Sequence, residues 1–120
     1  MRTLKQNFNR YTEVVAMDEP GDGGANHEYY ISRINDEKVP VGEFGFIKFQ
    51  KGPLRETKLN GGFIEDLLAI VIDRLESFQS GEFACKENAI VLRKMHEGVH
   101  WLNHRTKDRI DRNVEGKLIK

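Results

Sequence analysis

The chain has 120 residues, and its 19 basic and 19 acidic side chains give a formal net charge of zero at neutral pH. A chain of this length is expected to form a single domain over residues 1–120, with a core that needs no disulfide or metal. Zero net charge excludes a general electrostatic attraction to DNA, RNA or membranes, so any anion must bind at a local cluster. The single cysteine fits a reducing cytoplasm, and the sequence shows neither a signal peptide nor a membrane-spanning apolar run.

The N-terminal half is predicted to form a small antiparallel β-meander over about residues 10–50. Residues 1–9 are expected to be a polar, mobile arm. The segments predicted as strands are rich in β-branched or aromatic residues and are separated by Gly, Pro and Asn turns. They cover residues 10–17, 28–34 and 44–49. Strands joined by short links most simply pair with their neighbours in antiparallel order.

The C-terminal half is predicted to form an antiparallel two-helix hairpin over about residues 62–112. The first helix, at residues 64–78, is apolar on nearly every side, so it needs cover from more than one neighbour, and we expect another copy of the chain to supply it. The second helix is predicted at residues 86–111. Its apolar seam has spacings of 3, 4 and 3 and consists of Leu92, Met95, Val99 and Leu102. A two-helix hairpin packed on a small sheet gives an α+β fold.

A zinc-protease motif lies in the second predicted helix. His96, Glu97 and His100 match the pattern H-E-x-x-H, in which two histidines bind zinc and the glutamate acts as a base. His104 adds a third imidazole, so a small zinc hydrolase is the alternative function. Gly98 argues against it, because glycine is unusual in a helix that must hold a metal rigidly. We interpret the histidines as a solvated face and expect no catalytic residue, no metal and no cofactor.

Two other motifs have ordinary structural interpretations. Cys85 could act as a nucleophile, but no orienting third group is recognisable, and we expect a small core residue beside the second helix. The Gly-rich stretch at residues 21–24 resembles a phosphate cradle. It lacks the Lys-Ser/Thr of a P-loop and no helix follows it, so a hairpin loop is expected instead.

Side chains near both ends of the second helix have groups that can contact a nucleotide, and each also has an ordinary structural interpretation. Phe78 and Asn88 flank the interhelical turn, where an aromatic face can stack on a purine and a carboxamide can bond to its edge. Alternatively, Phe78 completes the core stripe and Asn88 caps the second helix. Arg105 and Thr106 offer a guanidinium and a hydroxyl to one phosphate. Arg109 continues this basic side, although basic residues also suit a helix C-terminus through its dipole.

Most of the chain, including the loop at residues 19–29, resembles a known family. The most specific segments are residues 65–78, 87–89, 101–102 and 105–106. They are similar to the phage-encoded Thoeris anti-defence sponge proteins of the first type, whose helical hairpin is shared with the second anti-CBASS sponge. One departure is Asn113, which stands where the family usually has glycine. Asparagine also tolerates a left-handed backbone, so the turn is expected to survive.

The resemblance implies a protein that is not an enzyme and that acts in the host bacterial cytoplasm. Such proteins bind glycocyclic ADP-ribose (gcADPR), which bacterial Toll/interleukin-receptor-type immune enzymes make, and keep it from the defence effector. They also bind cyclic di- or trinucleotides at a separate site and assemble as homo-oligomers, here expected to be hexamers, with ligands between protomers. Phe78 and Asn88 match the positions that hold gcADPR. Arg105 and Thr106 match those that hold cyclic trinucleotide phosphates.

Local chemistry adds three residues to these two sites. Asn26 and Arg109 are assigned to gcADPR, and Arg55 is assigned to the cyclic oligonucleotide. A third interpretation, from another functional class, is a pure assembly or protein-binding module that takes no small ligand.

Overall fold

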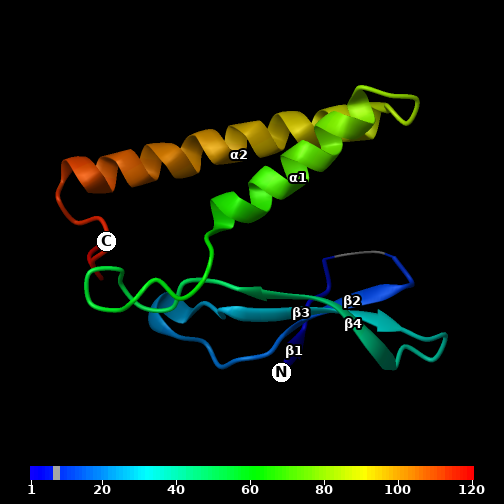
Figure 1. Cartoon of the computed structure of the whole chain (residues 1–120), viewed down its shortest axis with the longest axis horizontal. Coiled ribbons are helices and arrows are strands. Elements are labelled where there is room, and N and C mark those ends of the chain that lie inside the picture. The colour runs from blue at the N-terminus through cyan, green and yellow to red at the C-terminus, as the bar shows by residue number, and fades with distance from the viewer. Residues whose placement is uncertain (7–8) are drawn as a thin grey trace. The chain divides into compact units, whose positions relative to one another are not determined.

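The computed structural model describes residues 1–6 and 9–120 and shows an α+β fold, as the sequence predicts. The chain divides into two compact units, Met1–Gly62 and Phe63–Lys120. The first holds the strands and the second holds the helices (Figure 1). Among the described residues, no helix is both long enough and apolar enough to traverse a bilayer.

The N-terminal unit contains a four-stranded antiparallel sheet whose strands lie in chain order, which confirms the predicted meander. The strands are β1 (Arg2–Thr3), β2 (Thr12–Ala16), β3 (Glu28–Ile34) and β4 (Pro40–Lys48), and a 3-10 turn, η1 (Asp22–Gly24), precedes β3. The prediction of a mobile arm is wrong for Arg2 and Thr3, because these residues form β1 and pair with β2. Residues 7–8 of that arm lie outside the described residues.

β4 begins at Pro40 and not at the predicted residue 44. The prediction was wrong because the pairing of β4 with β3 is irregular. Ile31 pairs with Gly45, whereas Ser32 pairs with Glu43. Phe44 is therefore the extra residue of a β-bulge, and a second register shift follows towards the start of the strand. A bulge interrupts the two-residue alternation of a strand, so only the aromatic part of β4 could be recognised from the sequence.

Few side chains of the N-terminal unit are fully enclosed. Ala16 is completely buried, and Ile34 is buried at the end of β3. The aromatic contact between Tyr30 of β3 and Phe46 of β4, with ring centroids 4.8 Å apart, ties the edge strand β4 to its neighbour. Such cross-strand pairs each stabilise a sheet by roughly 0.2–1 kcal/mol.

Residues 49–62 leave β4 and return beside its end as a closed loop. The Gln50 N–H donates to the Gly62 carbonyl at 2.9 Å, and the Gly62 N–H donates to the Lys48 carbonyl at 2.8 Å. Inside the loop, the Asn60 carboxamide bonds to both the N–H and the carbonyl of Lys51, each at 2.8 Å. These bonds satisfy the polar groups of a segment that has no secondary structure of its own.

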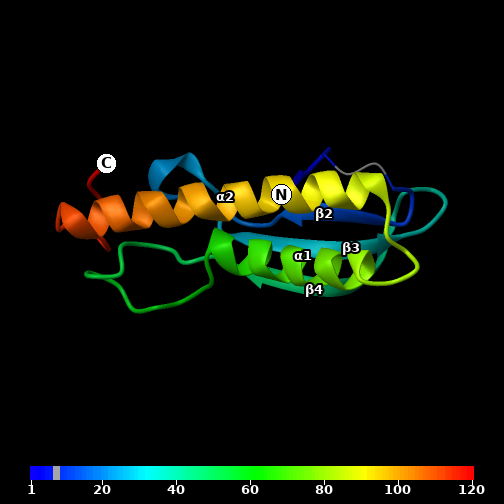
Figure 2. The same cartoon turned by 90° about the horizontal axis from the view of Figure 1, so that it is seen from above.

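The C-terminal unit is an antiparallel hairpin of α1 (Ile64–Gln79) and α2 (Lys86–Asp111), shown from two sides in Figures 1 and 2. Both helices match the predicted bounds to within one residue. α1 starts where the Asp66 carboxylate accepts a hydrogen bond from the Phe63 N–H at 2.8 Å, an arrangement that also suits the helix dipole. α1 has 16 residues and α2 has 26, so α2 extends past the start of α1 by about 15 Å.

The seam predicted for α2 is confirmed and is longer than expected. Half-buried residues recur along it at alternating spacings of four and three from Asn88 to Arg109, and Ile90 and Gly98 are half-buried beside them. The core stripe that the sequence predicts for α1 is partly wrong. It consists of Ile64, Leu67, Leu68, Val71, Leu75 and Phe78. Ile64 and Val71 are exposed, and Ile72 is half-buried instead. Several large apolar side chains of the hairpin remain exposed: Ile64, Ile70, Val71, Val91, Trp101 and Ile110.

We expect Gly98→Ala to raise the free energy of unfolding by about 0.5–1 kcal/mol, because alanine is favoured over glycine within a helix. The nearest atom to an added Cβ would be Leu68 Cδ1 at 3.8 Å, an ordinary van der Waals contact. Urea unfolding followed by circular dichroism measures the change, with Gly81→Ala outside the helices as the control. A loss of stability would mean that another chain approaches α2 at Gly98 more closely than α1 does.

Candidate functional site

The turn between the helices is closed by the side chain of Gln79. Its Oε1 accepts a hydrogen bond from the Cys85 N–H at 3.0 Å, and its Nε2 donates to the Cys85 carbonyl at 3.1 Å. This pair of hydrogen bonds fixes the end of α1 against the start of α2. Cys85 is exposed, so the expected core position is wrong.

Cys85 caps α2, so the capping role considered for Asn88 is also wrong. The Cys85 sulfur accepts a hydrogen bond from the Asn88 N–H at 3.4 Å. The half-buried Asn88 carboxamide is left without a hydrogen bond to any residue that the structure describes. A carboxamide has two donors and an acceptor to satisfy, so this position is suited to a polar ligand.

Phe78 lies in the last turn of α1, between a cation and a second aromatic ring. The guanidinium carbon of Arg74 is 5.0 Å from the centroid of the Phe78 ring. The ring of Phe83 meets Phe78 edge to face at 6.5 Å, and Phe83 itself is 69% exposed. An aromatic face beside a guanidinium can take both the base and the phosphate of a nucleotide. Sequence analysis missed Arg74, although its spacing of four residues from Phe78 was a usable signal.

The structure brings Phe78 and Asn88 to the same end of the hairpin. Leu68 lies opposite Gly98 across the helix interface. Phe78 lies ten residues from Leu68 along α1, and Asn88 lies ten residues from Gly98 along α2. Both steps run towards the turn and cover about 15 Å. Because the helices are antiparallel, the two side chains lie at the same level, and both belong to half-buried faces.

Arg105 and Thr106 lie on the part of α2 that extends beyond α1. The Arg105 side chain is exposed and makes no hydrogen bond or ion pair with the described residues. The Thr106 hydroxyl donates to the Leu102 carbonyl at 3.1 Å, as threonine often does within a helix. A phosphate that accepts a hydrogen bond from the Thr106 hydroxyl would have to displace the bond to Leu102. Asn88 and Arg105 are 17 residues apart on one helix, which corresponds to about 25 Å.

Arg109 binds the C-terminal tail. Its guanidinium donates to the carbonyls of Val114 at 3.0 Å, Lys117 at 2.7 Å and Ile119. Within one protomer, Arg109 lies at the opposite end of α2 from Phe78 and Asn88. Its side chain therefore has an intramolecular role that needs no ligand.

The turn after α2 forms as expected despite the missing glycine. Asn113 has a φ of 56°, in the left-handed region. The Val114 N–H donates to the Arg109 carbonyl and the Asn113 N–H donates to the Ile110 carbonyl, both at 2.9 Å. These two bonds define a Schellman motif, in which asparagine takes the position that glycine usually occupies.

Asn26 lies in the N-terminal unit and is 8% exposed. Its Oδ1 accepts a hydrogen bond from Arg2 Nη2 at 2.7 Å, and its Nδ2 donates to the Asp18 carbonyl at 2.5 Å. Both ends of the carboxamide are therefore used, one by Arg2 of β1 and the other by the loop that joins β2 to β3. Since these strands are antiparallel neighbours, the Gly-rich segment is part of a hairpin loop, as predicted.

The Asp18 carboxylate organises this loop. It accepts hydrogen bonds from the N–H groups of His27 and Glu28 at 3.1 and 3.2 Å, and its Oδ2 is 3.5 Å from His27 Nδ1. Desolvation raises the pKa of Asp18. The backbone hydrogen bonds from His27 and Glu28 and the side-chain bond from Asn26 outweigh desolvation and lower the pKa to about 2.

We expect Asp18→Asn to reduce the pH dependence of unfolding between about pH 4 and pH 2. The reference pKa of 3.8 falls to about 2 in the folded chain, so the carboxylate stabilises the fold above the reference value. That contribution is lost as the pH falls through the folded pKa. Melting temperatures measured across this range test the effect, with the exposed Asp22→Asn on the same loop as control. An equally steep acid transition in Asp18→Asn would assign it to other groups.

Arg55 lies at the exposed tip of the closed loop at residues 49–62, in the N-terminal unit. The tip is shaped by the Pro53 carbonyl, which accepts hydrogen bonds from the N–H groups of Glu56 at 3.0 Å and Thr57 at 2.8 Å. Arg55 is thus presented on an ordered turn.

The histidines of the H-E-x-x-H motif are exposed on α2. Trp101 meets His100 and His104 edge to face, with centroids 5.4 and 5.5 Å apart. His96 Nε2 is 3.8 Å from Glu76 Oε1 of α1. Over residues 1–6 and 9–120, no three His, Cys, Asp or Glu side chains are grouped so that they could hold a metal ion.

Comparisons with known proteins agree with this architecture. The model of the family described as Acb2/Tad1, hairpin domain, matches residues 43–107, which is more than half of the chain. Thoeris anti-defense 1 of Bacillus phage SBSphiJ7 is 46% identical over 86 residues, and the match covers 68% of this chain and 61% of that relative's length. The match to the family model includes both helices through Lys107 and the closed loop before them. The chain therefore belongs to the Acb2/Tad1 hairpin-domain family.

Proposed function

We propose that this protein is a phage anti-defence protein that binds gcADPR immune signals and holds them without cleaving them. The observation that carries the proposal is the turn end of the hairpin. There, the Arg74 guanidinium lies over one face of the Phe78 ring, and the Asn88 carboxamide has no partner among the described residues. The name of the related Bacillus phage protein supports an anti-defence role.

Sequestration requires affinity rather than chemistry. To compete with an immune receptor, the protein needs nanomolar affinity, on the order of −12 kcal/mol. Stacking and charge-assisted hydrogen bonds reach this value only in a closed, preorganised site. In one protomer the turn end is open, since Phe83 is 69% exposed.

The proposal therefore includes a homo-oligomer, a hexamer, in which another protomer closes each ligand site. The exposed apolar side chains of both helices, Ile70 and Trp101 among them, supply surface for this contact. Burial at a subunit interface would exclude water and strengthen each polar contact with the ligand. Because the signal is made inside the infected cell, the proposed place of action is the host bacterial cytoplasm.

A second site, for cyclic di- or trinucleotides, is proposed at Arg105 and Thr106. The Arg105 side chain has no partner among the described residues, so its guanidinium can bind a phosphate without breaking an ion pair. Such a site would be independent of the turn end, from which about 25 Å of helix separates it.

Ligand recovery tests the main proposal. The protein is incubated with gcADPR, freed of unbound ligand and denatured, and the released nucleotide is identified by mass spectrometry. Intact gcADPR is expected. A cleaved nucleotide would show an enzyme, and the absence of any nucleotide would favour an assembly module.

We expect Arg105→Ala to weaken cyclic trinucleotide binding and to spare gcADPR. Loss of one charge-assisted hydrogen bond costs about 1.5–3 kcal/mol, or roughly 10- to 150-fold in affinity. Calorimetric titration of each ligand into the variant measures the effect, and Arg93→Ala, which removes an exposed charge elsewhere on α2, is the control. Equal loss of both ligands would indicate one shared pocket.

A further inference from the structure

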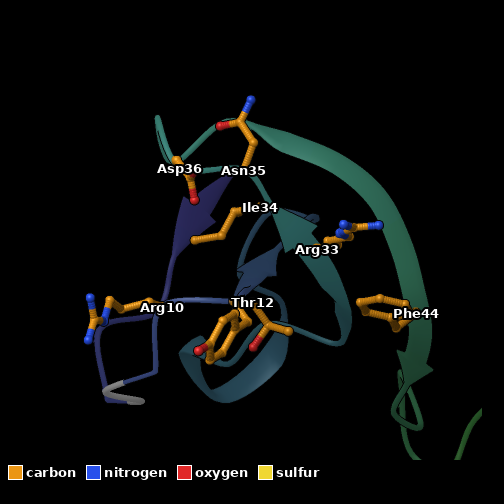
Figure 3. A pocket seen from close by; sticks show the side chains of 8 residues that line it. Arg10, Thr12, Arg33, Ile34, Asn35, Asp36 and Phe44 are labelled. Atoms are coloured by element: carbon orange, nitrogen blue, oxygen red, sulfur yellow. The ribbon is translucent and has the colours of Figure 1, made fainter.

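An open hollow of about 650 Å³ lies at one end of the N-terminal sheet (Figure 3). None of the residues assigned above to a ligand lines it. Its wall contains two arginines, two aromatic residues and three polar side chains around one apolar residue. These are Arg10, Tyr11, Thr12, Arg33, Ile34, Asn35, Asp36 and Phe44.

The hollow results from the way in which β4 departs from β3. Thr12 of β2 pairs with Arg33 of β3, and the Ile34 N–H still donates to the Tyr11 carbonyl at 3.0 Å. On the other side of β3, the bulge at Phe44 disturbs the pairing, and the ribbon that carries Phe44 arches away from the end of β3 (Figure 3). Bulges commonly redirect a side chain next to a functional site.

Two asparagines fix the backbone of turns beside the hollow. Asn9 Oδ1 accepts hydrogen bonds from the N–H groups of Tyr11 at 2.8 Å and Thr12 at 2.9 Å. Asn35 Oδ1 accepts two more, each at 3.0 Å, from the N–H groups of the following turn. Such turns restrict the backbone before any ligand arrives, which lowers the entropic cost of binding.

The charges of the hollow are unbalanced. Neither the Arg10 side chain nor the Arg33 side chain makes a hydrogen bond or ion pair with a residue that the structure describes. Their guanidinium groups outweigh the single carboxylate, that of Asp36, and Figure 3 shows them on different sides of the hollow. Beside them, Phe44 is 69% exposed and Tyr11 is 75% exposed. Guanidinium groups bind phosphate through paired N–H donors, and exposed rings stack on bases.

We infer that this hollow binds a small nucleotide, with its phosphates between Arg10 and Arg33 and its base on an exposed ring of the wall. The volume lies within the range of about 300–1,000 Å³ typical of small-molecule sites. This inference goes beyond the proposed function and does not rest on it, because no residue of the hollow belongs to the helical hairpin.

Calorimetric titration of the full-length protein with ADP, pyrophosphate and adenosine tests the inference. ADP is expected to bind more tightly than either fragment, because only ADP uses both the arginines and the aromatic wall. Arg33→Gln should weaken ADP binding by at least about tenfold, and Phe44→Leu should weaken it by about fivefold or more. Lys48→Gln, which removes an exposed charge from the same sheet outside the hollow, should leave it unchanged.

The same titrations separate this inference from the hairpin proposal. ADP binding that disappears in Phe78→Ala and persists in Arg33→Gln would place ADP on the hairpin and overturn the inference. A wild-type Kd for ADP weaker than about 1 mM would overturn it as well. If gcADPR fails to bind while ADP binding still depends on Arg33, the hairpin proposal fails and the hollow stands. Circular dichroism of each variant confirms that the sheet is folded.

Discussion

Phe78→Ala is expected to abolish detectable gcADPR binding at nanomolar concentrations while leaving the oligomer size unchanged. Removal of an aromatic stacking partner costs about 1–3 kcal/mol per base. Here the substitution also removes the ring that Arg74 covers at 5.0 Å, so we expect a loss of at least about two orders of magnitude. Calorimetry measures the affinity, and size-exclusion chromatography with light scattering measures the assembly.

The matched control is Phe63→Ala, an aromatic truncation at the opposite end of α1. Phe63 is 38% exposed and precedes the first turn of the helix. The Phe63→Ala protein should bind gcADPR with wild-type affinity. Wild-type affinity in a folded Phe78→Ala protein would instead show that Phe78 only packs against Phe83.

Gly61→Ala should cause the largest loss of stability among the glycine substitutions considered. A Cβ at this position would lie 2.4 Å from the carbonyl carbon and 2.5 Å from the carbonyl oxygen of Phe49. Backbone atoms cannot move aside as a flexible side chain can, so the closed loop at residues 49–62 must open. We expect a cost of about 3 kcal/mol or more, seen as a fall in melting temperature of at least about 10 °C.

Gly42→Ala is the control for this substitution, because no heavy atom lies within 4 Å of a Cβ built there. Its melting temperature should change by no more than a few degrees. If the Gly61→Ala protein has the melting temperature of the wild type, the loop does not hold its backbone pairing with β4 in solution.

The helices could be predicted closely because their signals are local and repeated. The seam through Leu92, Met95 and Val99 fixes the period of α2, and the apolar run from Ile64 fixes α1. β1 was missed because two residues cannot display a period. The start of β4 was missed because the bulge at Phe44 breaks the alternation that identifies a strand.

The candidate sites were predictable in position and less so in chemistry. The sequence places Phe78 and Asn88 beside the turn, and the structure puts both there. Whether a polar side chain is available depends on competing partners distant in the sequence. Asn26 bonds to Arg2, which lies 24 residues away, and Arg109 bonds to the C-terminal carbonyls. Cys85, in contrast, takes over the cap and leaves Asn88 available.

The unequal lengths of α1 and α2 divide the hairpin into parts that can open separately. Near the turn, the backbone of α2 is held by α1 and by Gln79, so its amides should exchange with solvent only when the hairpin unfolds. Beyond Leu102 there is no facing turn of α1, and within the helical unit the tail held by Arg109 supports this part of α2. The last turns of α2 should therefore fray at a lower free energy. Arg105 would then belong to a different cooperative unit from Asn88, so deletion of the tail would loosen one end of α2 without disturbing the other.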